Sequence, residues 1–75
     1  MSAYYFSVAL DNYRTLCLAP LTDRRIAASG QDIQDVSGYF LYEKRGYGDG
    51  AEIDILAQAL SDEAALRLRE LLQMT

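Results

Sequence analysis

Residues 38–59 read GYFLYEKRGYGDGAEIDILAQA, and this stretch decides the fold. Residues 38–45 are rich in aromatic side chains, which favour β-strands. Residues 46–50 contain three glycines, which permit the sharp reversal of a hairpin. Residues 51–59 alternate as a second strand does, with one face formed by Ile53, Ile55, Ala57 and Ala59. The stretch therefore predicts an antiparallel hairpin.

A second hairpin is predicted at the start of the chain. Residues 3–10 alternate with the period of a strand, and residues 13–19 continue in a strand-like run that ends before Pro20. A three-residue loop at 11–13 keeps the apolar side chains of both strands on one face, whereas a two-residue loop puts the leucines on the other face. We favour the three-residue loop, which sets Val8 opposite Leu16 and Phe6 opposite Leu18.

Two helices follow the two hairpins. The first is expected over Leu21 to Gly30, with Thr22 as N-cap and a glycine that can end a helix in the left-handed conformation. Residues 31–37 form a polar linker. The second helix begins after Ser61, and its apolar stripe consists of Ala64, Ala65, Leu68, Leu71 and Leu72.

The element order is therefore strand, strand, helix, strand, strand, helix, or ββαββα. The 75 residues suffice for a single small α+β domain, residues 1–75. We predict a two-layer sandwich, in which a four-stranded antiparallel sheet carries both helices on one face. The opposite face of the sheet then needs a separate explanation.

The composition argues against catalysis. The chain has no histidine and a single cysteine, so it lacks the commonest general base and the commonest zinc ligand. Cys17 lies in a predicted strand, where a buried thiol is expected. The carboxylates lack the spacing of a calcium loop. We therefore predict no enzyme activity, no catalytic residues, no metal site and no cofactor.

The sequence predicts a cytoplasmic protein. A single cysteine cannot form an internal disulfide, and the first residues lack the pattern of a secretory signal. Apolar runs are much shorter than the roughly 20 residues of a membrane helix, so no membrane partner is expected.

Charge is distributed unevenly along the chain. Eleven acidic against seven basic residues give a net charge of −4, and residues 31–63 hold eight acids against two bases. An acidic region of this kind selects basic partner surfaces, although acids at strand edges also serve solubility. Tyr47, at the tip of the glycine loop, has no evident core position. The candidate partner-binding residues are Asp32, Asp35, Tyr47, Asp49, Glu52 and Asp54.

The general profile resembles the small acidic inhibitors that phages encode, including anti-CRISPR proteins. The resemblance rests on the short length, the net negative charge, the compact α+β pattern, the lack of catalytic equipment and the acidic stretch from Asp32 to Glu63. It implies a non-enzymatic protein of the host cytoplasm that inhibits a larger nucleic-acid-handling complex by occupying a basic surface. No direct contact with nucleic acid is then expected, and no residue role is carried over.

One alternative stays open at this point. The chain could be a homodimeric regulatory or interaction module of a bacterial cell that buries its open sheet face. Its candidate contacts are Tyr5, Tyr42 and Leu56.

Overall fold

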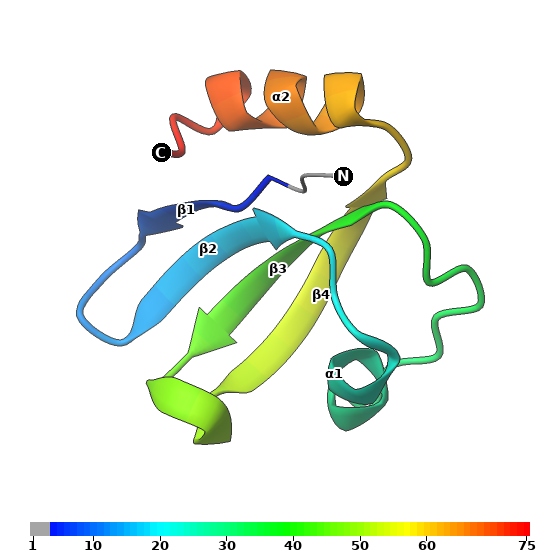
Figure 1. Ribbon diagram of the computed structural model, residues 1–75. Helices are drawn as coiled ribbons and strands as arrows, with labels where there is room; N and C mark the ends of the chain where they lie inside the picture. Colours follow the sequence, from blue (N-terminus) through cyan, green and yellow to red (C-terminus); the bar gives the residue numbers. More distant parts are fainter. Residues whose placement is uncertain (1–3) are drawn as a thin grey trace.

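A computed structural model describes residues 4–75, except for the side chain of Asp49 (Figure 1). A four-stranded antiparallel sheet has the strand order β1-β2-β3-β4, so each strand pairs with its neighbour in sequence. The predicted order of strands and helices is confirmed. The elements are β1 (Phe6–Ala9), β2 (Arg14–Ala19), α1 (Asp23–Ala28), β3 (Tyr39–Arg45), a short 3-10 helix η1 (Gly48–Gly50), β4 (Glu52–Ala59) and α2 (Asp62–Leu71).

The first hairpin has the predicted register. Phe6 pairs with Leu18 and Val8 with Leu16. The carboxylate of Asp11 fixes the turn, because its Oδ1 accepts hydrogen bonds from the backbone N–H groups of Tyr13 and Arg14, at 2.8 and 2.7 Å. The loop of three residues is therefore confirmed.

The two helices lie on opposite faces of the sheet, which corrects the prediction that they share one face. In Figure 1, α2 lies above the sheet and α1 below it. α1 covers an apolar cluster that contains Cys17, Phe40 and Tyr42, and α2 covers another that contains Leu18 and Tyr39. Because apolar residues occupy both faces of the central strands, each face needs a cover. The architecture is a sheet between two helices, not a two-layer sandwich.

A β-bulge in β4 explains part of this arrangement. Leu41 pairs with Ala57, but the next pair is Tyr42 with Ile55, so Leu56 is an extra residue opposite β3. The bulge reverses the alternation, and Ile55 therefore belongs to the α1 cluster while Ala59 belongs to the α2 cluster. The prediction of one continuous apolar face from Ile53 to Ala59 is wrong for this reason.

Both helices have the predicted N-caps. The hydroxyl oxygen of Thr22 accepts from the backbone N–H of Arg25 at 3.3 Å, and that of Ser61 accepts from Ala64 at 3.0 Å. Gly30, just beyond α1, has φ +75°. The predicted stripe of α2 is confirmed except at Leu71, which is 72% exposed.

The chain end lies along β1, the edge strand of the first hairpin. Met74 is buried in the α2 cluster. The backbone groups of Thr75 and Ser7 exchange two hydrogen bonds of 3.0 Å, so Thr75 extends the sheet by one residue pair at this edge. Among residues 4–75, no helix has both the length and the apolar character to span a bilayer.

Candidate protein-binding surface

The linker between α1 and β3 covers part of β4, the other edge strand. The side-chain amide of Gln31 acts there as a strand partner would. Its Oε1 accepts from the backbone N–H of Ile55 at 2.7 Å, and its Nε2 donates to the Ile55 carbonyl at 2.9 Å. β4 pairs with β3 on one side only. The bonds from Gln31 therefore satisfy backbone groups of Ile55 that point away from β3, toward the open edge of the sheet.

Gln58 fixes the other end of the linker. Its Nε2 donates to the carbonyl oxygens of Asp35 and Ser37, at 3.0 and 2.6 Å. The carboxylate of Asp35 in turn accepts bonds from the hydroxyl and backbone N–H of Ser37, which lower the pKa of Asp35. The linker is thus held along β4 from Ile55 to Gln58.

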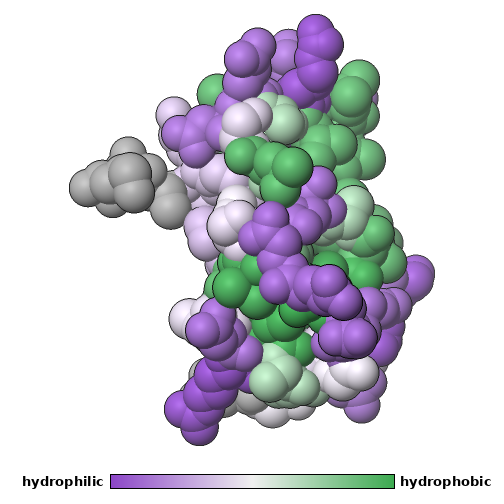
Figure 2. Space-filling model, turned by 90° about the vertical axis from the view of Figure 1, so that its right-hand side faces the viewer, coloured by the Kyte–Doolittle hydropathy of each residue, from purple (hydrophilic) through white to green (hydrophobic). Residues whose placement is uncertain are grey.

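This packing gathers exposed apolar side chains that are distant in sequence. Val36 of the linker is 42% exposed, Leu56 of the bulge 54%, and Leu60 after β4 72%. They lie along the same edge of the sheet, because Gln58, which lies between the two leucines in sequence, binds the backbone on both sides of Val36. Figure 2 looks onto this side and shows several hydrophobic areas, which a band of hydrophilic groups divides.

Four of the predicted partner-binding acids lie along the same strand edge. Asp32 and Asp35 are exposed on the linker, and Glu52 and Asp54 belong to the hairpin end of β4. Asp35 binds Gln58 through its carbonyl oxygen, and Gln58 is six positions from Glu52, so Asp35 and Glu52 are separated by about 20 Å of strand. Asp32 lies closer to Asp54, because Gln31 binds the backbone of Ile55. The residues that we call the β4 edge surface are Asp32, Asp35, Val36, Glu52, Asp54, Leu56 and Leu60.

Three carboxylates at the hairpin end, those of Glu43, Glu52 and Asp54, form ion pairs with the same arginine. Arg45 lies 3.4 Å from Glu43, 3.5 Å from Glu52 and 3.8 Å from Asp54, measured between guanidinium nitrogens and carboxylate oxygens. Its hydrogen bond to Glu43, followed by the charges of the three carboxylates, raises the pKa of Arg45. Arg14 is the second cation, 4.0 Å from Glu43. Most of the charge of Glu52, whose side chain is 75% exposed, remains available to solvent.

The other two predicted partner-binding residues, Tyr47 and Asp49, lie in the hairpin loop and not along β4. Tyr47 is 75% exposed in the hairpin loop, as expected, but it precedes the 3-10 helix and does not belong to the β4 edge surface. The backbone of Asp49 lies in that 3-10 helix, and its side chain is outside the described part of the chain.

The candidate contacts for a homodimer do not form one surface. Tyr42 is 3% exposed and belongs to the core, where burial raises the pKa of its hydroxyl. Tyr5 and Leu56 are both exposed but lie near opposite edges of the sheet, three strand spacings or about 14 Å apart. The prediction of a shared dimer face is therefore wrong for Tyr42 and has no contiguous patch for the other two.

Sequence reasoning missed two members of the surface, Val36 and Leu60. Each is a single apolar residue in a polar context, a pattern that carries no signal by itself. The two glutamines were the available clue, since Gln31 and Gln58 tie the linker to β4, but nothing in the sequence gives their partners. Among the side chains that the structure describes, no group of three or more His, Cys, Asp or Glu could hold one metal ion.

The comparisons with known proteins add no identity. No family model matches the chain. No curated protein and no solved structure gives a match either.

Proposed function

We propose that the chain is a non-enzymatic binding protein that inhibits a larger nucleic-acid-handling protein by covering a basic surface with its β4 edge surface. The observation that carries the proposal is the presence of three exposed apolar residues, Val36, Leu56 and Leu60, along the strand edge that also carries four acids. Protein interfaces commonly combine an apolar centre with a polar rim. The carboxylates then take the place that phosphates occupy on the partner.

The charge of the surface favours a different protein over a second copy. In a symmetric dimer each β4 edge surface would meet itself, and its four acids would face like charges. A basic partner removes this repulsion, and attraction between opposite charges raises the association rate at low salt. We therefore expect a monomer in light scattering.

Capture from a bacterial lysate tests the proposal, with the immobilised protein used at low and at high salt. The expected result is a nucleic-acid-binding protein that is retained at low salt only and that releases its nucleic acid when the chain is added. Leu60→Ser and Asp32→Lys should abolish capture. The matched controls lie on α2, where Leu71→Ser starts from the same 72% exposure and Glu70→Lys makes the same charge change.

Two results would contradict the proposal. One is capture that the Leu60 and Asp32 variants leave unchanged, which would place the interface elsewhere. The other is a captured partner whose nucleic acid stays bound when the chain is in excess, which would exclude inhibition by occlusion.

A further inference from the structure

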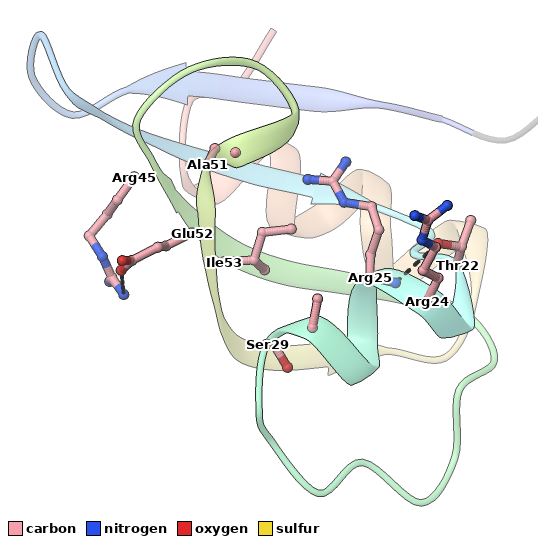
Figure 3. A pocket seen from close by; sticks show the side chains of 10 residues that line it. Thr22, Arg24, Arg25, Ser29, Arg45, Ala51, Glu52 and Ile53 are labelled. Carbon is pink, nitrogen blue, oxygen red and sulfur yellow. Dashed lines mark hydrogen bonds and ion pairs between the residues drawn. The ribbon is translucent and has the colours of Figure 1, made fainter.

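An open groove separates α1 from the β3–β4 hairpin (Figure 3). Its volume is about 1050 Å³. One wall is α1, and the other is the backbone where η1 leads into β4. Its lining includes Thr22, Arg24, Arg25, Ala51, Glu52 and Ile53.

The wall formed by α1 carries two adjacent cations. Arg24 and Arg25 are exposed, and no carboxylate whose side chain the structure describes lies within ion-pair distance of either. This differs from the opposite end of the groove, where Arg45 is already paired with Glu52 at 3.5 Å. The two guanidiniums favour an anionic group, and a guanidinium binds a carboxylate with two parallel hydrogen bonds.

The opposite wall offers a free strand edge. Gln31 occupies the outward N–H and C=O of Ile55, as described above. Outward backbone groups recur at every second residue of a strand, so those of Ile53 point the same way. No described residue bonds to them. The edge is therefore open at Ile53 and closed at Ile55 by the Gln31 amide.

We propose that this groove binds an extended acidic segment of a partner protein, which pairs with β4 at Ile53 and places carboxylates against Arg24 and Arg25. An added strand obtains affinity from backbone bonds and specificity from alternate side chains. Alternation directs every second side chain toward α1, where the arginines lie. The open shape of the groove suits an extended chain. The groove meets the β4 edge surface at Glu52, whereas the exposed apolar residues Val36, Leu56 and Leu60 do not line it.

A fluorescein-labelled peptide of alternating valine and glutamate is a direct probe, measured by fluorescence polarisation. The expected result is saturable binding that the matching valine–lysine peptide does not show. Arg24→Gln combined with Arg25→Gln should weaken binding by about tenfold or more, since charge-assisted hydrogen bonds are lost. The control is Arg67→Gln with Arg69→Gln on α2, which makes the same change in net charge and should have little effect.

Amide hydrogen exchange tests the strand pairing independently. Peptide binding should slow exchange at Ile53 and leave Ile55 unchanged, because Gln31 already holds the Ile55 amide. The proposal is overturned if Ile53 exchange stays the same, if both arginine pairs matter equally, or if a single-stranded oligonucleotide binds in place of the peptide. A dimer that the Arg24 and Arg25 changes dissociate would show instead that a second copy fills the groove. The Leu60→Ser variant should bind the peptide normally, which separates this site from the proposed inhibitory surface.

Discussion

Gln31 has a structural role that the sequence does not indicate. In the polar linker it reads as a solvated side chain, yet its amide forms both hydrogen bonds of a missing strand partner. A side-chain amide is suited to this because it carries a donor and an acceptor in one plane, as a peptide group does. One glutamine thus shields Ile55 from edge-to-edge pairing with other chains.

Replacing Gln31 with alanine should destabilise the fold. Two partly buried hydrogen bonds are lost, at about 0.5–1.5 kcal/mol each, so the free energy of unfolding should fall by about 1–3 kcal/mol. Urea denaturation measures the difference. Gln34→Ala is the control, because Gln34 is exposed in the same linker. An equal effect of the two substitutions would contradict the assigned contact.

Asp11 predicts a specific pH dependence. Hydrogen bonds from the backbone of Tyr13, and then from the side chain and backbone of Arg14, lower the pKa of Asp11 from its ordinary 3.8 to about 2. A lowered pKa in the folded state stabilises the fold above the ordinary value, and this stabilisation is lost as the pH falls from 3.8 through 2.

An NMR titration of the Asp11 carboxyl carbon should therefore have its midpoint near 2. In the Arg14→Gln variant the midpoint should rise but stay below 3.8, because the backbone bonds remain. The stability difference between the protein and Asp11→Asn should be present at neutral pH and disappear below the midpoint. A midpoint at the ordinary value would show that the turn does not hold the carboxylate.

At the scale of elements, the sequence predicts helices and hairpins well where the signal is local. The register of β1 and β2 follows from loop length and alternation, and the caps at Thr22 and Ser61 follow from side-chain chemistry. The face that each helix covers does not follow, because the central strands are apolar on both faces and the bulge at Leu56 changes the alternation of β4. A bulge has no clear pattern of its own, and one extra residue reverses every later side chain in the strand.

The cap of α2 can be tested by one substitution. Ser61→Ala removes the acceptor for the Ala64 N–H and should cost about 1 kcal/mol in the free energy of unfolding. Ser61→Asp keeps an acceptor and adds a favourable charge at the helix start, so it should restore the loss. Chemical denaturation of the three proteins gives the comparison. Equal destabilisation by both substitutions would mean that the cap geometry, not the acceptor, matters.

At the scale of the whole molecule, residues 4–75 form two apolar clusters, one on each face of the sheet. Ile26 anchors α1 in one cluster, and Met74 is buried in the other. Substitutions at sites without common neighbours usually add in their effects on stability. The two faces should thus contribute separately to one cooperative unfolding transition.

A double-mutant cycle measures this independence. Ile26→Val should cost about 1 kcal/mol and Met74→Ala about 2–5 kcal/mol. The double variant should lose the sum of the two, within about 0.5 kcal/mol. Urea denaturation of all four proteins provides the values. A larger coupling would show that the sheet transmits packing changes from one face to the other.

Only part of the candidate surface could be predicted from the sequence. Acids in the sequence indicated a charged interface, and the structure brings Glu52 and Asp54 together with Arg45. The apolar centre of the surface could not be predicted, because it depends on where the linker lies against β4. The same is true of the groove, whose two arginines precede its strand edge by more than twenty positions.

The pairing of Thr75 with Ser7 also has a consequence for the order of folding. These residues are 68 positions apart, whereas every strand pair joins neighbours in sequence. Closing a longer loop costs more chain entropy, so short-range hairpins are favoured early. We therefore expect the meander to assemble first and the C-terminal segment to dock last. Nascent molecules would then pass through a stage in which β1 is still an unprotected edge, and its exposure to other chains would depend on how quickly Met74 reaches its place.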